Sequence, residues 1–250
     1  MAANLSIQNT AYVSDQDVFL LSYPRSGNTW LRQMLTDVYF QLLGEDTSDP
    51  QFLIDHFFTA SPSFENQDIS NCKRPALDFF MFKCHDAQVA ERFRFVYIYR
   101  NPEDALVSYF RFMKKRPITF MEEGLEDFCR LQLLAWQHHV DVAIKSSSRG
   151  LFVSYAEMIT QTEACLLRVC EFVGLEATPQ QISLAVSHNT PQVQRQRYTK
   201  VGGTSMADYS IATASVGGNI EFLSSALIDE IQGSAKQQIA ELNRFVSVFN

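Results

Sequence analysis

From residue 18 to residue 30 the chain reads VFLLSYPRSGNTW. The apolar run Val18–Ser22 is typical of a buried strand, and an amphipathic helical pattern begins after Trp30. Between them, Pro24 and Gly27 shape a short turn. Backbone N–H groups at such a strand–loop–helix junction converge, and the helix N-terminus favours a negative charge there. The stretch therefore predicts an anion-binding loop at the end of a buried strand.

The side chains of this loop favour the same interpretation. Arg25 supplies a positive charge, and Ser26, Asn28 and Thr29 supply hydrogen-bond donors. The spacing G-x-x-x-x-G-K-[ST] of nucleotide-hydrolysing loops is absent. A strand–helix turn with a surface arginine is the plainer alternative, and the loop alone does not exclude it.

Three more apolar runs predict buried strands, and helical patterns follow two of them. Asn101 is suited to cap the helix after the strand Phe93–Tyr99, and Pro102 to occupy the first position of that helix. One helix is expected from about Glu157 to Val173. Strands that alternate with helices predict an α/β fold with a parallel central sheet flanked by helices and a P-loop-like anion loop. Ligands bind such sheets at the carboxyl ends of the strands. The three runs are Phe79–Lys83, Phe93–Tyr99 and Leu151–Tyr155.

Composition sets limits on the class of protein. The chain has 250 residues, of which 46% are hydrophobic and 20% charged, and no linker divides it, so we expect one domain over residues 1–250. A net charge of −7 argues against nucleic acid as a partner. Neither a signal peptide nor an apolar run long enough to span a bilayer is evident, and the five cysteines form no C-x-x-C pair. These features favour a cytoplasmic protein without a membrane or metal site.

A second anion site is predicted at the end of the strand Phe93–Tyr99. Arg100 ends this strand and Ser108 follows in the second turn of the next helix, so both can grip one phosphate. A kinase of the P-loop class typically has an acidic metal ligand at the end of a core strand, whereas here the strand ends in arginine.

A candidate catalytic pair closes the strand Phe79–Lys83. Lys83 and His85 point to the same side of an extended chain and can reach one cavity. Histidine can remove a proton from an acceptor near neutral pH, and lysine can balance negative charge on a leaving group. A histidine after an apolar strand is also common as a structural residue.

These motifs resemble those of the cytosolic sulfotransferases, which use 3′-phosphoadenosine 5′-phosphosulfate (PAPS). That family has a loop of the form T-Y-P-[KR]-S-G-[TN]-T-W, a K-x-H segment and an R-N-P-x-D-x-x-x-S motif. They match residues 23–30, 83–85 and 100–108, and the resemblance extends from Phe19 to about Ile231. It implies sulfonate transfer to a small molecule, with PAP as the second product and no metal.

The resemblance also implies roles for individual residues. His85 is the expected general base, assisted by Lys83, while Arg100 and Ser108 are expected to bind the 3′-phosphate. Trp30 and Tyr155 are expected near the adenine. Arg25 stands where the family usually has lysine, and its pKa is too high for it to donate a proton to the leaving group.

The family's R-K-G segment, which closes over the 3′-phosphate, has no clear counterpart. Two Val-Gly-Gly runs, at 201–203 and 216–218, compete for its place, and basic residues precede only the first. We therefore predict that Arg197 or Lys200 takes this role.

The acceptor is left open between a hydroxyl group and an amine or guanidine nitrogen. Aromatic stretches at 52–58 and 79–82 suit a flat phenol or steroid, whereas Asp55, Asp78 and Asp86 suit a cationic secondary metabolite. Two other functions remain as alternatives: a nucleotide kinase with a degenerate loop, and a non-catalytic nucleotide-binding module. The sequence does not determine the oligomeric state.

Overall fold

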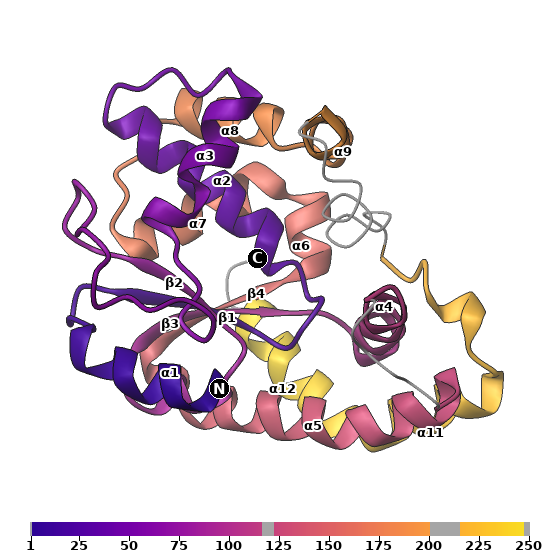
Figure 1. Ribbon diagram of the computed structural model, residues 1–250. Helices are drawn as coiled ribbons and strands as arrows, with labels where there is room; N and C mark the ends of the chain where they lie inside the picture. The colour runs from indigo at the N-terminus through magenta and orange to yellow at the C-terminus, as the bar shows by residue number, and fades with distance from the viewer. Residues whose placement is uncertain (1, 117–122, 201–215, 248–250) are drawn as a thin grey trace.

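Four parallel strands form the centre of the protein in a computed structural model that describes residues 2–116, 123–200 and 216–247 (Figure 1). The strands are β1 (Val18–Ser22), β2 (Met81–Cys84), β3 (Arg94–Tyr99) and β4 (Gly150–Ser154). Their order in the sheet is β2-β1-β3-β4. The chain leaves β1 on one side to reach β2 and returns on the other side to β3. Crevices for ligands form at such a switch point, outside the carboxyl ends of the strands.

Helices cover both faces of the sheet. The helices are α1 (Ala2–Asn9), α2 (Asn28–Leu42), α3 (Pro50–Ala60), α4 (Pro102–Lys114), α5 (Leu125–Lys145), α6 (Tyr155–Thr160), α7 (Thr162–Val173), α8 (Pro179–His188), α9 (Pro191–Lys200), α11 (Ser225–Ser234) and α12 (Lys236–Ser247). Short 3₁₀ turns lie at Thr10–Tyr12, Ala87–Glu91, Ser147–Arg149 and Ile220–Phe222. Figure 1 shows α2, α3, α7 and α8 on one face and α5, α11 and α12 on the other.

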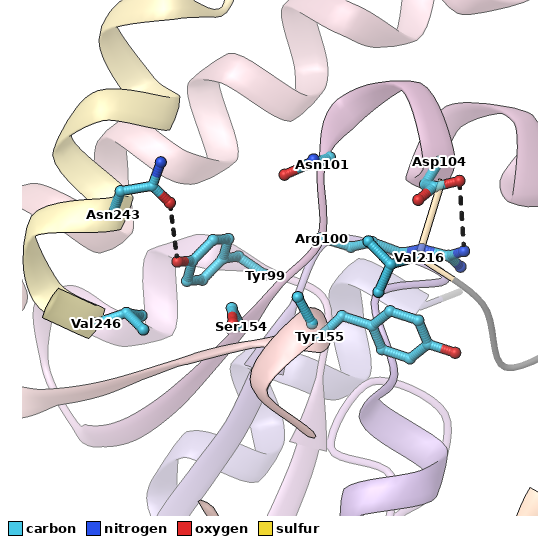
Figure 2. Close-up of a pocket in the computed structure, with 10 residues that line it drawn as sticks. Tyr99, Arg100, Asn101, Asp104, Ser154, Tyr155, Val216, Asn243 and Val246 are labelled. Atoms are coloured by element: carbon cyan, nitrogen blue, oxygen red, sulfur yellow. Dashed lines mark hydrogen bonds and ion pairs between the residues drawn. The ribbon is translucent and has the colours of Figure 1, made fainter. Parts of the chain in front are cut away.

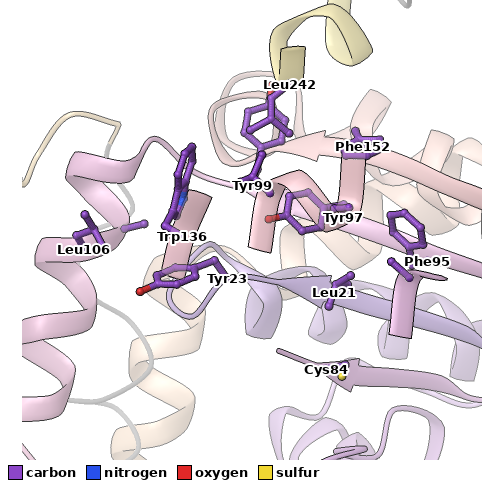
Figure 3. Packing of buried hydrophobic residues seen from close by; sticks show 14 of the residues in the cluster. Leu21, Tyr23, Cys84, Phe95, Tyr97, Tyr99, Leu106, Trp136, Phe152 and Leu242 are labelled. Carbon is purple, nitrogen blue, oxygen red and sulfur yellow. The ribbon is translucent and has the colours of Figure 1, made fainter. Parts of the chain in front are cut away.

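Alternate side chains of each strand enter two separate cores. Leu20 of β1 packs with residues of α2 and α7, whereas Leu21 packs with residues of α5 and α12. In the second of these cores, Trp136 of α5 lies 1% exposed over the sheet, among aromatic side chains of β3 (Figure 3). Strands buried on both faces need apolar residues at nearly every position, which explains the uninterrupted apolar runs in the sequence.

The predicted elements are confirmed with shifted boundaries. β2 begins at Met81 and not at Phe79, because the Phe80 N–H donates to the carboxylate of Asp17 at 2.7 Å before the ladder starts. Asn101 occupies the N-cap of α4 as expected, but its side chain makes no capping hydrogen bond.

The prediction of a single helix from Glu157 to Val173 is wrong. The chain forms α6 and α7, which are separated at Gln161, where φ is −137° and ψ is 46°. The hydroxyl of Thr162 donates to the carbonyl of Met158 at 2.7 Å and so satisfies an acceptor in the last turn of α6. A threonine side chain that competes for backbone groups in this way favours a helix end over a helix interior.

Within the described part of the chain, no helix is long and apolar enough to cross a membrane. The same residues contain no group of three His, Cys, Asp or Glu side chains placed to hold a metal ion.

Candidate active site

The loop after β1 has an unusual backbone. Arg25 has φ of 71° and Gly27 has φ of 107°, so two residues of this short segment lie in the left-handed region. For Arg25 this conformation costs about 1 kcal/mol or more, and such strain persists where the surroundings impose it, often at functional sites. At Gly27, an added Cβ would lie only 2.7 Å from the ring of Tyr155. The loop therefore requires glycine at residue 27 for both its dihedral angle and its packing.

Polar side chains in the loop divide into two groups. The side-chain amide of Asn28 donates to the Leu20 carbonyl at 2.6 Å and to Ser22 Oγ at 3.3 Å, so it ties the start of α2 to β1. Its remaining donor toward an anion is its backbone N–H, at a helix start where such groups lack helical partners. Ser26 Oγ is buried and has no hydrogen-bond partner among the described residues. A buried hydroxyl in that state fits a site that binds an oxyanion.

Two guanidinium groups lie together behind this loop. Arg25 Nε donates to Ser108 Oγ at 3.3 Å, and Arg100 Nη1 lies 3.5 Å from the Arg25 carbonyl oxygen. Burial, and then the positive charge of Arg100, lowers the pKa of Arg25 to about 10, so Arg25 stays charged at neutral pH. The structure thus brings the three predicted anion ligands into one cluster, where a bound phosphate would reduce the repulsion between the arginines.

Arg100 is held in place from two sides. Its guanidinium lies 4.5 Å from the ring centroid of Tyr155 and 3.7 Å from the carboxylate of Asp104. The exposed fraction of Arg100 is only 6%. A buried arginine that is stacked and ion-paired in this way is oriented before any ligand binds.

Asp104 also docks a distant segment onto this cluster. Its carboxylate accepts from the backbone N–H of Gly217 at 2.6 Å and of Asn219 at 3.1 Å. The second Val-Gly-Gly run therefore lies beside Arg100, although it brings no basic residue. Arg197 and Lys200 fall within α9, but their side chains lie outside those that the structure describes.

A cavity of about 270 Å³ opens at the carboxyl ends of β3 and β4 (Figure 2). Arg100, Tyr155 and Val216 form one wall, and Asn243 and Val246 of α12 form the opposite one. Its volume lies just below the range usual for small-molecule sites, so it suits a part of a nucleotide better than a whole one.

Trp30 and Tyr155 lie near each other at the start of α2 and α6. Their ring centroids are 6.5 Å apart with planes at 71°, and the Trp30 Nε1–H donates to the Asn189 carbonyl at 2.8 Å. Trp30 is half-buried, so part of its indole ring remains open to a ligand. A flat aromatic surface next to the arginine cluster is suited to stack a nucleobase.

His85 is oriented by the strand that carries the anion loop. Its Nδ1 lies 2.7 Å from the carbonyl of Ser22, the last residue of β1. A carbonyl only accepts, so Nδ1 carries the proton and Nε2 is the basic nitrogen of the neutral ring. Burial, and then the neighbouring Lys83, lowers the pKa of His85 to about 4, so the imidazole is neutral at physiological pH.

Glu65 joins the two predicted catalytic residues. Its Oε2 accepts from Lys83 Nζ at 2.8 Å and its Oε1 accepts from the backbone N–H of His85 at 2.6 Å. Burial acts to raise the pKa of the Glu65 carboxyl, but the neighbouring His85 and Lys83 together outweigh it, so this pKa is lowered. Glu65 lies beyond α3, in a segment that pairs with β2 through a bridge between Ser63 and Lys83. No motif in the sequence indicated Glu65, because only this pairing brings it to the site.

His139 of α5 supports the backbone of His85. Its Nε2–H donates to the His85 carbonyl at 3.1 Å, and its Nδ1 accepts from the Tyr97 hydroxyl at 2.8 Å. Burial, and then the proximity of His85, lowers the pKa of His139 to about 3. A neutral imidazole with both nitrogens engaged fixes the backbone at His85.

Comparison with known proteins agrees with this arrangement. The family model described as the sulfotransferase domain matches residues 15–240. The 3-beta-hydroxysteroid sulfotransferase of Cavia porcellus is 23% identical over 200 residues, covering 74% of this chain and 68% of that protein. Human sulfotransferase 2A1 is 24% identical over 226 residues, covering 82% and 73%. The amine sulfotransferase of Oryctolagus cuniculus is 24% identical over 189 residues, covering 71% and 62%.

Solved structures share the fold. Mouse sulfotransferase SULT7A1 complexed with PAP superposes with a TM-score of 0.70 at 19% identity, covering 99% of this chain and 95% of that one. Retinol dehydratase in complex with androsterone and inactive cofactor PAP gives a TM-score of 0.67 at 16% identity, covering 94% and 85%. The match to the family model, over residues 15–240, includes all four strands of the sheet and most of the helices. This chain therefore belongs to the sulfotransferase family.

Proposed function

We propose that this sulfotransferase moves a sulfonate group from PAPS to a small-molecule acceptor with His85 as the general base. The observation that carries the assignment of the base is the hydrogen bond from His85 Nδ1–H to the carbonyl of Ser22. It leaves Nε2 as the proton acceptor, on a residue tied to the strand that leads into the anion loop. Turnover of a His85→Asn protein with labelled PAPS tests the assignment.

The family motifs support a division of the anion ligands. Arg25, Ser26 and the backbone N–H groups of residues 27–29 are proposed to hold the phosphosulfate, and Arg100 with Ser108 the 3′-phosphate. PAPS, when bound, supplies a sulfonate whose bond to the phosphate breaks as the bond to the acceptor forms. The acceptor proton passes to His85 Nε2. The remaining ligands proposed for the nucleotide are Trp30 and Tyr155, with Gly27, Asn28 and Thr29 of the loop.

Positive charge in the site acts by electrostatics. With a pKa of about 10, Arg25 keeps its proton at neutral pH and stabilises negative charge on the transferring group. Lys83 lies near His85 and is a second cation that we propose for the leaving phosphate. Catalysis would then depend chiefly on positioning and charge, as in phosphoryl transfer.

Glu65 and Lys83 are expected to shift the pH dependence in opposite directions. The charge of Glu65 raises the pKa of His85 and that of Lys83 lowers it. Glu65→Gln should therefore move the acid limb of kcat below pH 4 and reduce kcat by about tenfold, since Lys83 loses its charged partner. Lys83→Met should move the acid limb up, toward the unperturbed histidine pKa of about 6.5. Initial rates from pH 4 to 8 measure both, and shifts in the same direction would contradict these opposed effects.

The segment that closes over the 3′-phosphate is proposed to take its charge from Arg197 or Lys200. Replacing the contributing residue with alanine should weaken PAP binding by about tenfold, as expected for a lost charged hydrogen bond. Calorimetric titration of each variant with PAP measures the effect. Arg195→Ala is a matched control on the same helix, and unchanged affinity in both test variants would refute the proposal.

For the acceptor, we propose a hydroxyl group or an amine or guanidine nitrogen of a secondary metabolite. Of the three acidic residues expected to favour a cation, Asp86 is next to the proposed base, because it directly follows His85. Asp78 precedes β2, at the opposite end of that strand, and Asp55 is exposed on α3. Phe79, Phe80 and Phe82 are at most 7% exposed and pack in the cores, so they are not acceptor contacts. Relatives named for hydroxysteroids and amines support testing both classes with labelled PAPS.

The proposal extends to organisation and location. We propose one sulfotransferase domain over residues 1–250, with its core at about 18–231, acting in the cytoplasm on small molecules and needing no metal. The net charge of −7 supports small molecules over nucleic acid as partners.

A further inference from the structure

Asn189 links two residues on the same face of α2. This buried residue follows α8, and its side-chain Nδ2 donates to Asp37 Oδ2 and to the Ala185 carbonyl, both at 2.8 Å. Its carbonyl accepts from Trp30 Nε1 at 2.8 Å. Trp30 and Asp37 are seven residues apart, about two helical turns or 10 Å along the axis. One residue from another helix thus joins the aromatic ring at the start of α2 to a carboxylate further along.

Asp37 is the fixed point of this connection. Its exposed fraction is 0%, and its carboxylate accepts from Thr47 Oγ1 at 2.5 Å and from Gln41 Nε2 at 2.7 Å, in addition to Asn189. His188 Nδ1 lies 3.2 Å from the same carboxylate. A buried carboxylate is tolerated only with such partners, and together they leave it little freedom to move.

Trp30 gains a defined orientation from this arrangement. Because its N–H is bonded to the Asn189 carbonyl, the ring cannot turn without breaking a hydrogen bond. A ring that is already oriented loses less conformational entropy when a ligand stacks on it, and this strengthens binding.

We propose that Asp37 is a positioning residue for the nucleotide: through Asn189, it holds the Trp30 indole ring ready for the adenine of PAPS. The inference rests on the proposed function, which places Trp30 at the nucleobase. Asp37 itself touches neither the nucleotide nor the reacting atoms in this account. Its effect should therefore fall on nucleotide affinity and on the mobility of Trp30, and little on the chemical step.

The test compares two buried aspartates. Asp37→Asn replaces one carboxylate oxygen with an amide donor, so the side chain can no longer accept from Asn189 on one oxygen and from Thr47 and Gln41 on the other. PAP binding should weaken by about three- to tenfold, the usual effect of a lost hydrogen bond. The KM for PAPS should rise similarly, with kcat at saturation nearly unchanged. Asp17→Asn is the matched control: Asp17 is 1% exposed and paired with Arg74, but it precedes β1, at the opposite end of the sheet from the site. It should leave PAP affinity within about twofold of wild type, well below a lost hydrogen bond.

Fluorescence provides a second readout. Trp136 is the only other tryptophan in the chain, so a Trp136→Phe background reports on Trp30 alone. In this background Asp37→Asn should lower the anisotropy of Trp30 without PAP. Should Asp37→Asn not fold, Asn189→Ala decides, because it removes the link while Asp37 keeps Thr47 and Gln41. Asn189→Ala should likewise weaken PAP binding.

Binding by the Trp30→Ala protein distinguishes the positioning role of Asp37 from the placement of Trp30 at the nucleobase. Weaker PAP binding in Trp30→Ala together with wild-type binding in Asp37→Asn and Asn189→Ala would overturn the positioning role alone. Wild-type binding in Trp30→Ala would overturn the placement of Trp30 at the nucleobase, and the positioning role with it. Non-additive losses in the double variant of Asp37 and Asn189 would support one shared link.

Discussion

Turnover should fall by about a hundred- to ten-thousandfold when His85 is replaced with asparagine, the range typical for loss of a general base. The asparagine amide can keep the hydrogen bond to the Ser22 carbonyl, so the variant removes the basic Nε2 with little change in packing. Initial rates with labelled PAPS at pH 7 and saturating acceptor measure the loss, and PAP affinity should be unchanged. His138→Asn, which alters an exposed histidine on α5, is the matched control and should keep full activity.

The pH dependence of the wild-type enzyme gives the same assignment a second test. A general base must be unprotonated, and the pKa of His85 is lowered from about 6.5 to about 4. The protonation of His85 should therefore not change the activity between pH 5 and pH 8, and the acid limb should lie near pH 4. Full turnover in His85→Asn would contradict the assignment, whereas an acid limb at pH 6.5 that this residue causes would contradict only the lowered pKa of His85.

Stability must be followed in the same experiment. The pKa values of His85 and His139 fall to about 4 and about 3 in the folded protein, whereas both are about 6.5 when unfolded. Below pH 6.5 the unfolded chain binds more protons than the folded one, so the free energy of unfolding decreases as the pH falls from 6.5 toward 4. Circular dichroism at each pH separates unfolding from loss of the base.

Arg100→Ala should weaken PAP binding by about ten- to hundredfold, because a buried charged hydrogen-bond donor to a phosphate is lost and Asp104 is left without its cation. Arg100→Lys should fall between wild type and alanine, since lysine keeps the charge but lacks the planar fork and the stacking on Tyr155. Calorimetric titration with PAP measures the three proteins.

A nucleotide without the 3′-phosphate shows which group Arg100 contacts. Adenosine 5′-phosphate should bind wild type and Arg100→Ala with similar affinity, because the proposed contact is missing from both complexes. Arg130→Ala, on an exposed arginine of α5, should not change PAP binding. An equal loss of affinity for both nucleotides in Arg100→Ala would assign this arginine to another part of the ligand.

The site residues that the sequence predicted belong to short local motifs. The loop after β1 is continuous in the chain, and Arg100 and Ser108 are separated by a strand end and two turns of one helix. Strand periodicity likewise predicted that the side chains of Lys83 and His85 share a side, and in the structure the Lys83 ammonium and the His85 backbone N–H both contact Glu65. In these cases the geometry follows from one element and its neighbour, so spacing was sufficient.

Helix boundaries were less certain because they depend on side-chain competition. The break at Gln161 follows from the Thr162 hydroxyl bonding to a backbone carbonyl, which hydrophobic periodicity does not register. Asn101 shows the converse, since a residue type that favours capping occupies the N-cap position without making the bond.

The sequence by itself determined the fold class and the protein family and predicted the anion loop, because these depend on residues close together in the chain. The tertiary structure alone decided what supports them. Asp37 meets Asn189 across 152 residues and Asp104 meets Gly217 across 113, and Glu65 reaches His85 only because its segment pairs with β2. Contacts at such separations depend on how helices pack on the sheet, and no spacing rule within one element specifies them.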